Sequence, residues 1–496
     1  MTGPSTGSGS GVFGAIDIGA SSGRVVAGRL TGSGLELEVV HRFPNGATVV
    51  DGHLRWNLSR LFEEVLDGLT ALARRHPDVA SVGIDTWAVD YGLLDDRGRL
   101  LAEPVAYRDD RTDAVVAAVH DRVDPGRLYA VTGLQFLPFN TLYQLAAEQQ
   151  GPLWGRARHA LLLPDLLAYW LTGQARTEVT NASTTGLLDA RTRTWSTELF
   201  ERLGLPGDLF PPLIQPGETL ARLLPEVVQR TGLAASTTVV AVGSHDTASA
   251  VVGVPADDRS FAYVSSGTWS LVGLELDRPV LTPESREANF TNEGGVDGRT
   301  RYLRNVGGLW LLQESLRTWS EAGLPADQDA LLAEAAKLPT GGPTVDVDAA
   351  AFIPPGDMPE RIRAACVDRG LPPPVTPAGV VRCILDSLAL AYARTVLAAE
   401  RLSGLAVTVV HVVGGGSQNE LLCQLTADLL QRPVLSGPVE ATALGNLALQ
   451  ARAAGQLPQD LDDLRRSLRR GLSLQSYQPS RQPGSPPPAE QLSTAR

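Results

Sequence analysis

The chain has 496 residues, of which 43% are hydrophobic and 20% are charged. That length exceeds what one hydrophobic core usually serves, so we expect two large domains with a ligand in the cleft between them. The formal net charge of −12 argues against a nucleic-acid partner, because phosphate backbones are bound by clustered lysine and arginine. The longest apolar stretch is too short for a bilayer span, and the first residues lack a secretory signal pattern, so no membrane role is expected.

Lysine and cysteine usage narrows the chemistry. Lys337 is the one lysine of the chain, which excludes a P-loop, a protein-kinase phosphate site and a pyridoxal Schiff base, because each needs a positioned lysine. We expect Lys337 to be a solvated charge at a helix end. The cysteines Cys366, Cys383 and Cys423 form no CxxC motif, so a reducing cytoplasm is the simplest location. The spacing leaves open whether Cys366 and Cys383 pair.

The first elements predict a meander followed by a helix and a strand. Short β-rich runs lie at 12–18, 24–30 and 35–43, which predicts three strands. Residues 57–75 have apolar positions at helical spacing behind Asn57, a candidate N-cap, and 79–85 return as a buried strand. This order opens an actin-like, ribonuclease H-like domain.

The second half repeats the pattern. Residues 261–276 predict a strand, a Ser/Gly turn and a strand, and 379–402 predict a long helix. A strand at 407–413 then meets a glycine turn and a further helix, an arrangement that suits phosphate because free amides at a helix start attract anions.

These elements define the expected domain organisation. We place a boundary near residue 256, which gives an N-terminal domain of residues 12–256 and a C-terminal domain of residues 257–477. The Gly/Ser-rich residues 1–11 and the Pro-rich residues 478–496 are expected to be flexible tails.

The segment Ile16–Arg24, "IDIGASSGR", is the first candidate phosphate site. An aspartate at a strand end followed by a glycine-bounded turn lets backbone N–H groups face a phosphate, and Asp17 is a candidate magnesium ligand acting through water. A plain β-hairpin is the alternative. The same residues also match the pattern G-x-S-x-G, in which Ser21 would be the nucleophile of a serine hydrolase. In those enzymes the turn at the nucleophilic serine leads from a strand into a helix, whereas a second strand follows here.

The segment Val242–Val254, "VGSHDTASAVVGV", holds the candidate general base. Asp246 follows a buried run and stands beside His245, at a position where pKa values are often perturbed. A well-placed carboxylate in a dry site can accept the proton of an attacking hydroxyl during phosphoryl transfer. The alternatives are that Asp246 is a helix N-cap and that His245 is a structural histidine.

Three further motifs are weaker alone. Thr268 and Gly267 lie in "SSGTWS" and could hold phosphates from a second hairpin, or form only a tight turn. Gly414, Gly415 and Gly416 precede a helix and suit a nucleotide lying close to the backbone. In "IDTWAVDYG", Trp87 is either core or a surface for an apolar sugar edge.

Taken in chain order, these segments resemble the FGGY family of carbohydrate kinases, and several are most similar to its rhamnulokinase branch. The resemblance covers Phe13 to about Leu472. The segments that carry it are "DIGASSGRV", "GIDTWAVDYGLLD", "YRDDRT", "TGLQFLPFNTLYQL", "LLLPDLLAYWLTG", "TNASTTGLLD", "SHDTASAV", "YVSSGTWSL", "NFTNEGG", "RNVGGLWLLQE", "CILDSLALAYA", "VVGGGSQNELLCQLTADLL" and "SGPVEATALGNLALQA".

The resemblance implies a cytoplasmic enzyme with two actin-like domains, α/β in class, and a nucleotide and sugar cleft between them. It implies transfer of the ATP γ-phosphate, with Mg²⁺, to O1 of L-rhamnulose in rhamnose degradation. Asp246 then resembles the proton acceptor. The implied sugar contacts are Ala88, His245, Asp246, Thr247 and Asn305. The implied nucleotide contacts are Ala20, Ser21, Ser22, Gly23, Arg24, Thr268, Gln313 and Gly415.

One position departs from the family pattern. Where relatives commonly show "DTWGVD", this chain has Ala88, and a methyl group there narrows the room for a sugar beside the backbone. Other FGGY acceptors, namely L-fuculose, a xylulose or glycerol, are therefore alternatives. A non-catalytic actin-like ATPase is a further alternative from a different class.

Overall fold

The computed structural model describes residues 11–480, so most of the two expected tails, 1–11 and 478–496, lies outside the described residues. Two compact units divide the chain. Unit 1 combines Met1–Asp257, Leu276–Arg301 and Ala441–Leu472, and unit 2 combines Asp258–Glu275, Tyr302–Glu440 and Ser473–Arg496. These units are discontinuous in sequence, whereas the domains expected at 12–256 and 257–477 are continuous. The continuous division stays a prediction at the level of the family.

Unit 1 is built on a mixed sheet whose order is β11-β12-β6-β1-β2-β3. β1, β2 and β3 form the expected antiparallel meander, and β6 runs parallel to β1. Because β2 is antiparallel to β1, the turn at Ser21 leads into a strand, as the sequence predicts. A serine-hydrolase nucleophile would lie at a turn from a strand into a helix, so the structure excludes that interpretation of Ser21. The strands of unit 1 are β1 (Val12–Ile18), β2 (Ser22–Thr31), β3 (Gly34–Pro44), β4 (Thr48–Val50), β5 (His53–Arg55), β6 (Val79–Thr86), β7 (Tyr91–Leu94), β8 (His159–Leu162), β9 (Thr177–Glu178), β10 (Leu213–Ile214), β11 (Thr219–Arg222), β12 (Thr238–Val240) and β15 (Thr291–Gly294).

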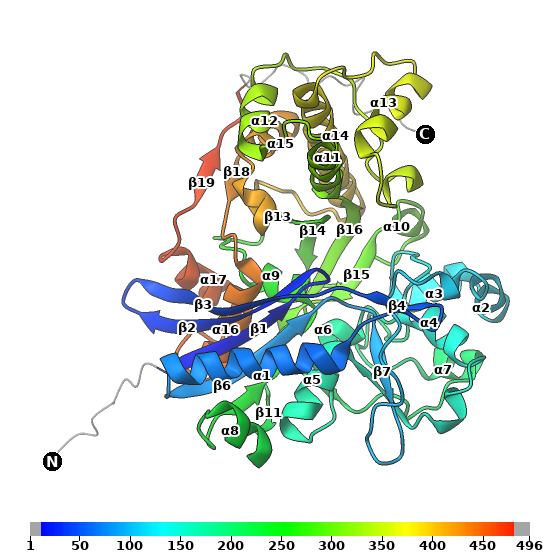
Figure 1. Ribbon diagram of the computed structural model, residues 1–496, viewed down its shortest axis with the longest axis vertical. Coiled ribbons are helices and arrows are strands. Elements are labelled where there is room, and N and C mark those ends of the chain that lie inside the picture. The colour runs from blue at the N-terminus through cyan, green and yellow to red at the C-terminus, as the bar shows by residue number, and fades with distance from the viewer. Residues whose placement is uncertain (1–10, 481–496) are drawn as a thin grey trace. The chain divides into compact units, whose positions relative to one another are not determined.

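Helices cover both faces of this sheet. Ile16 and Val25 pack in one core cluster with Val65 of α1, which Figure 1 shows lying along the meander. Phe13 and Ala15 belong to a second cluster with residues of α16 on the other face. The helices of unit 1 are α1 (Leu58–Arg75), α2 (Val116–Arg122), α3 (Pro125–Thr132), α4 (Thr141–Glu148), α5 (Leu163–Thr172), α6 (Val179–Ala182), α7 (Thr197–Leu203), α8 (Pro225–Thr231), α9 (Asp246–Val252), α10 (Pro283–Glu287), α16 (Ala441–Ala453) and α17 (Leu461–Arg469).

The predicted start of α1 is confirmed in atomic detail. The Asn57 side chain accepts a hydrogen bond from the backbone N–H of Arg60, which satisfies one of the free amides of the first turn. Apolar residues at helical spacing, among them Leu58, Val65 and Leu72, are buried. The helix therefore has the cap and the buried face that its sequence indicates.

Unit 2 repeats the strand order. Its strands follow the sequence β16-β14-β13-β17-β18-β19 in their sheet, with β13 antiparallel to β14 and parallel to β17. The strands are β13 (Phe261–Ser266), β14 (Trp269–Leu276), β16 (Thr300–Gly307), β17 (Val409–Val413), β18 (Val434–Ser436) and β19 (Gln475–Tyr477). The helices are α11 (Trp310–Glu321), α12 (Gln328–Ala336), α13 (Met358–Asp368), α14 (Pro377–Ser403) and α15 (Glu420–Leu430). The structural repeat expected from the sequence is confirmed.

Single-residue expectations in unit 2 have clear outcomes. Lys337 is exposed and is the C-cap of α12, as predicted for a solvated helix-end charge. Cys366 and Cys383 are buried free thiols whose Sγ atoms lie 4.0 Å apart. Within residues 11–480, no helix combines the length and apolar character that crossing a membrane requires.

Candidate functional site

Two carboxylates end neighbouring strands of unit 1. Asp17 of β1 and Asp85 of β6 are register partners in the parallel pair. Successive residues of a strand face opposite sides of the sheet, so Asp17 shares the face of Phe13 and Ala15, which cluster with α16. Asp85 lies on this face too, because its Oδ2 accepts a hydrogen bond of 2.6 Å from Asn446 Nδ2 of α16. Both acidic side chains therefore point to the α16 side of the sheet.

Asp246 joins these carboxylates at the start of α9. The Thr86 N–H donates to Ser244 O at 2.9 Å, and Thr86 forms a parallel bridge with His245. This pairing places Asp246 at the carboxyl end of β6. Its carboxylate accepts hydrogen bonds from Thr247 N at 2.5 Å and from Thr247 Oγ1 at 3.1 Å, while 33% of the side chain stays exposed. The N-cap of α9 is His245, so the reading of Asp246 as an N-cap is wrong.

Burial and the charge of Asp17 change the proton affinities of Asp246 and Asp85. Burial raises the pKa of Asp246, and the negative charge of Asp17 raises it further against the lowering effect of His245. Burial also raises the pKa of Asp85 well above its ordinary range, and Asp17 again adds to the shift. A carboxylate with a raised pKa is a stronger proton acceptor. Asp246 therefore combines a half-open position with enhanced basicity.

Asp17 and Arg24 form a cross-strand ion pair. They are register partners of β1 and β2, and Arg24 Nε and Nη2 lie 2.9 Å and 2.6 Å from Asp17 Oδ2. The turn between these strands closes with a hydrogen bond of 2.9 Å from Gly19 N to Ser22 O. Ser21 and Ser22 are exposed at this turn, and Ala20 is half-buried. The predicted phosphate-binding turn thus presents small side chains and one arginine.

The predicted role of Asp17 as a magnesium ligand stays a prediction. Among residues 11–480, no group of three or more His, Cys, Asp or Glu side chains is arranged to hold a metal ion directly. Asp85 Oδ1 is buried without a hydrogen-bond partner in the described structure. Oxygen donors around a half-open position suit a hydrated Mg²⁺, which keeps several of its waters.

A buried Glu–Arg pair supports His245 from behind. His245 Nδ1 lies 3.2 Å from Glu293 Oε2 and 3.1 Å from Arg301 Nη2, and Arg301 Nη1 lies 2.9 Å from Glu293 Oε2. On its other side, His245 Nε2 lies 3.4 Å from Asp246 Oδ1. The side chains of His245, Glu293 and Arg301 are 9%, 8% and 0% exposed. Sequence reasoning missed Glu293 and Arg301, although Glu293 lies in "NFTNEGG".

Glu178 holds the segment that leads into the base. This buried carboxylate is the N-cap of α6, and its Oε2 also accepts from Ser244 N at 3.1 Å and from Ser244 Oγ at 2.7 Å. Burial raises the pKa of Glu178 against the lowering effect of its hydrogen bonds to Thr180 and Ser244. Glu178 therefore fixes the backbone two residues before Asp246, a role that its place ahead of "TNASTTGLLD" does not reveal.

The turn at Ala88 is organised around the buried carboxylate of Asp90. Asp90 Oδ2 accepts hydrogen bonds from Trp56 Nε1 at 2.6 Å, Trp87 Nε1 at 2.9 Å and Tyr107 N at 3.2 Å, and Oδ1 accepts from Gln144 Nε2 at 3.1 Å. Trp87 is buried, and its ring centroid lies 4.3 Å from that of Trp56. Trp87 is therefore a core residue of the turn, as one of its two sequence readings proposed.

Val89 has a strained backbone beside Ala88. Its φ of 68° falls in the left-handed region, which is unfavourable for a β-branched residue. Thr141 Oγ1 donates to Val89 O at 2.7 Å, and the Asp90 network holds the following residue. Ala88 itself is half-buried. These contacts hold Val89 in its strained conformation. That conformation in turn determines the direction of the backbone at Ala88.

Unit 2 brings its glycine turns together. A Cβ at Gly416 would lie 2.0 Å from Ser266 Oγ, and one at Gly308 would lie 2.5 Å from Thr268 O. Gly416 therefore has to be glycine for the turn before α15 to pack on the end of β13. Trp310 N donates to Thr268 O at 3.2 Å, which ties the β13–β14 turn to the start of α11.

The other predicted contacts of unit 2 are placed as follows. Gln313 lies in the first turns of α11, where its N–H donates to Leu309 O at 2.8 Å. Gly415 is exposed, and a Cβ added there would meet nothing within 4 Å. Asn305 is half-buried on β16. Thr268, Gln313 and the glycine turn belong to the same unit, while no structural contact assigns Asn305 to a sugar.

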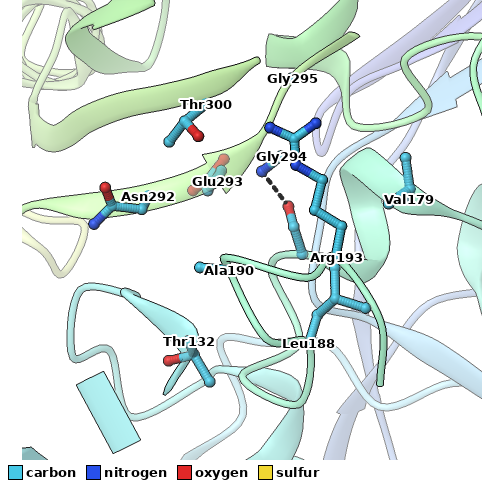
Figure 2. A pocket seen from close by; sticks show the side chains of 11 residues that line it. Thr132, Val179, Leu188, Ala190, Arg193, Asn292, Glu293, Gly294, Gly295 and Thr300 are labelled. Atoms are coloured by element: carbon cyan, nitrogen blue, oxygen red, sulfur yellow. Dashed lines mark hydrogen bonds between the residues drawn. The ribbon is translucent and has the colours of Figure 1, made fainter. Parts of the chain in front are cut away.

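Two cavities of unit 1 are described. One, of about 10 Å³, lies beside Glu293 and is lined by Ser183 and Arg193 among others, and the Gly294 N–H donates to Ser183 Oγ at 2.7 Å. Figure 2 shows Glu293, Gly294 and Arg193 among the residues around this cavity. The other, of about 240 Å³, is lined by residues of α2, α3 and α4. The first has room for about one water. None of the predicted site residues lines either cavity.

Comparison with known proteins matches both halves of the chain to one family. Residues 12–253 match the N-terminal domain of the FGGY family of carbohydrate kinases, and residues 262–454 match its C-terminal domain. Both matched ranges fall inside the domains expected from the sequence. The resemblance stated from the sequence motifs is confirmed.

Individual relatives agree with these matches. A rhamnulokinase of Bacteroides thetaiotaomicron is 42% identical over 94% of this chain and 96% of its own length, and one of Pectobacterium carotovorum is 44% identical over 94% and 92%. Among solved structures, a gluconate kinase of Lactobacillus acidophilus has a TM-score of 0.77 at 18% identity, covering 98% of this chain and 95% of its own. A Plasmodium falciparum glycerol kinase with ADP has a TM-score of 0.76 at 17% identity, covering 95% and 94%. The structural matches confirm the two-domain α/β fold class.

Proposed function

The chain belongs to the FGGY family of carbohydrate kinases, and from this premise we propose that it transfers the γ-phosphoryl group of ATP to O1 of L-rhamnulose. The products are L-rhamnulose 1-phosphate and ADP, as in rhamnose degradation. Two relatives that are 42% and 44% identical to this chain over 94% of its length carry the name rhamnulokinase, which supports this acceptor. The substrates are a sugar and MgATP, and the proposed location is the cytoplasm.

The observation that carries the proposal is the Asp246 carboxylate. It is half-open to solvent, held by Thr247, and more basic than an ordinary aspartate because of burial and the charge of Asp17. A general base must take the hydroxyl proton as that oxygen attacks, and a raised pKa favours this transfer at neutral pH. Magnesium, arriving with the nucleotide, supplies neutralisation of the developing phosphate charge.

The remaining residues follow from their positions. We propose that the turn from Ala20 to Arg24, with Thr268, Gln313 and Gly415, contacts the nucleotide through backbone N–H groups and short side chains. Ala88, His245, Thr247 and Asn305 are proposed sugar contacts. In this assignment residues 12–256 carry most of the sugar side and residues 257–477 carry most of the nucleotide side.

Asp246→Asn tests the base assignment. The amide keeps the shape of the side chain but accepts no proton at neutral pH, so sugar-dependent ADP formation should fall by at least about 100-fold, the usual contribution of a general base. ATP binding, followed by quenching of tryptophan fluorescence or by calorimetry, should persist. Near-normal turnover of the folded variant would contradict the assignment.

Ala88 favours a second candidate, a kinase for another ketose or polyol. The half-buried methyl group stands on a turn whose backbone direction is fixed by Val89 and Asp90. A panel of L-rhamnulose, L-fuculose, xylulose and glycerol, read by coupled ADP detection, compares kcat/KM directly. ADP release that is independent of every sugar would instead support the actin-like ATPase alternative.

A further inference from the structure

We propose that Arg301 is a positioning residue for His245, and that its guanidinium keeps the proton of the neutral ring on Nε2, the nitrogen that faces Asp246. Arg301 is the second residue of β16 and the last residue of the segment Leu276–Arg301 that belongs to unit 1. It lies 56 residues beyond His245 in the sequence, so no local motif connects the two. The inference rests on the proposed function, in which Asp246 is the base and His245 is a sugar contact.

The hydrogen bond between Arg301 and His245 has only one possible direction. Arg301 Nη2 lies 3.1 Å from His245 Nδ1, and a guanidinium has N–H donors but no acceptor. His245 Nδ1 therefore supplies the lone pair and carries no proton. Because a neutral imidazole has one protonated nitrogen, the proton of this ring is on Nε2.

The protonated nitrogen faces the candidate base. His245 Nε2 lies 3.4 Å from Asp246 Oδ1. A proton on Nε2 turns the positive end of the N–H dipole toward this carboxylate and favours its ionised form, which is the form that accepts a proton. A lone pair on Nε2 would repel the ionised carboxylate instead. The same N–H group is the donor that His245 offers to an oxygen atom of a bound sugar.

Glu293 balances the charge of Arg301 without a hydrogen bond to the ring. Its Oε2 lies 2.9 Å from Arg301 Nη1 and 3.2 Å from His245 Nδ1, but within the described structure this buried oxygen has no hydrogen-bond partner. Burial acts to raise the pKa of Glu293, and the charge of Arg301 is the largest of the effects that lower this pKa below its ordinary value. The carboxylate is therefore ionised and offsets a buried positive charge, while the hydrogen bond at Nδ1 comes from Arg301.

Arg301 is held in place independently of His245. Its side chain is fully buried, and its Nε donates to Gly294 O at 3.0 Å. If the His245 ring were turned over about the Cβ–Cγ bond, ring carbons would replace Nδ1 and Nε2, and the Nη2 donor of Arg301 would lose its acceptor. A buried donor without an acceptor is costly. The position of Arg301 therefore selects both the orientation of the ring and the nitrogen that carries the proton.

Nitrogen NMR on the full-length enzyme tests the protonation directly. The protein is labelled with ¹⁵N-histidine, and the His245 signals are identified by their loss in His245→Asn. At neutral pH we expect a protonated Nε2 and an unprotonated Nδ1, read from the two ¹⁵N shifts and from the long-range couplings to the ring protons. A protonated Nδ1 in the wild-type enzyme would overturn the proposal without any further variant.

Two substitutions separate the effect of Arg301 from that of Glu293. Arg301→Met removes the donor and leaves the Glu293 carboxylate next to the ring, so the proton should move to Nδ1. Glu293→Gln keeps Arg301, so His245 Nδ1 should stay unprotonated. A His245 spectrum that changes in Glu293→Gln and not in Arg301→Met would contradict the assignment. If Arg301→Met does not fold, the wild-type spectrum still decides the matter.

Kinetics measure the consequence for the reaction. An imidazole in the wrong tautomer lowers turnover even where the site keeps its geometry, and a displacement of about 1 Å near the reacting atoms can cost about 100-fold. In Arg301→Met we therefore expect kcat/KM for the sugar to fall by at least about tenfold, while KM for ATP stays within about twofold. Arg301→Lys keeps a charged group that only donates, and it should lose less activity than Arg301→Met.

Arg382→Met is the matched control. Arg382 is a buried arginine of α14 whose Nε lies 2.9 Å from Asp386 Oδ2, and its side chain is 6% exposed. Its described contacts include none of the residues assigned to the site. Equal sugar kinetics in Arg301→Met and Arg382→Met would refute the positioning role. If Asp246→Asn is inactive and His245 Nδ1 is protonated, only this inference fails; if Asp246→Asn is active, the proposed function fails.

Discussion

Replacing Asp90 by Asn measures what it costs to ionise a carboxylate inside the Ala88 turn. Asp90 is 1% exposed, and burial raises its pKa from 3.8 to about 6, against the lowering effect of hydrogen bonds from Trp87, Trp56 and Gln144. A shift of about two units corresponds to about 3 kcal/mol. The charged side chain thus opposes folding at neutral pH by roughly this amount, while its hydrogen bonds keep the turn in place.

The sign of the pH dependence follows from the direction of the shift. The unfolded chain releases the Asp90 proton near its ordinary pKa and the folded chain only near pH 6, so the folded state binds more protons between these values. Stability from this group therefore falls as the pH rises through that window and is constant above it. Between about pH 4.5 and about pH 7.5 the loss amounts to about 2 kcal/mol.

Asp90→Asn removes this dependence and keeps most of the contacts. The amide oxygen can accept from Trp56, Trp87 and Tyr107 in place of Oδ2, and only the contact with Gln144 Nε2 becomes unfavourable. Unit 1 has about 300 residues, for which about 2 kcal/mol corresponds to a shift in Tm of about 3 °C. The Tm of the variant relative to wild type should therefore rise by about 3 °C from the acidic to the neutral buffer.

Melting curves by circular dichroism at the two pH values, at equal ionic strength, give this difference. Asp95→Asn is the control, because hydrogen bonds from Arg99 lower the pKa of Asp95 to about 2. Asp95 is ionised in both states across most of the window, so its variant should differ from wild type by nearly the same Tm at both pH values. A gap between Asp90→Asn and wild type that does not change with pH would refute the reasoning.

Two further predictions concern unit 2. Gly416→Ala should lower the Tm and raise KM for ATP, because its Cβ would lie 2.0 Å from Ser266 Oγ and overpacking costs about 1–3 kcal/mol. Gly415→Ala is the control, because a Cβ there has open space around it, and this variant should melt like wild type. An equal decrease in Tm in both variants would contradict the packing argument. Iodoacetamide should leave Cys366, Cys383 and Cys423 unmodified in the native protein and label all three after denaturation. The reason is that these thiols are buried and that burial raises the pKa of each one. Mass spectrometry measures the labelling, and modification of any of the three in the native protein would contradict the prediction.

Local patterns determined the elements of both sheets. The Asn57 cap, the apolar spacing of α1 and the β-rich runs of the meander each act within a few residues, so their physics is readable along the chain. The same holds for the position of Asp17 at a strand end before a glycine turn, although its pairing with Arg24 across the hairpin was not predicted. Turn and cap chemistry is short in range, and sequence reasoning captured it.

The partners of the candidate base could not be read in this way. Asp85 receives its hydrogen bond from Asn446, 361 residues later, and His245 meets Arg301, 56 residues later. The membership of 276–301 and 441–472 in unit 1 is equally invisible, since no local propensity says which sheet a returning segment joins. These contacts depend on packing between distant segments.

By itself, the sequence determined the strand–turn chemistry, the doubled strand order and the identity of Asp246 as the acid worth testing. Only the tertiary structure decided how basic that acid is, because its pKa depends on burial and on the charge of Asp17 brought beside it. It also decided that a buried Glu293–Arg301 pair stands behind His245. Proton affinity and ring orientation arise from surroundings assembled in three dimensions, and a linear chain does not contain those distances.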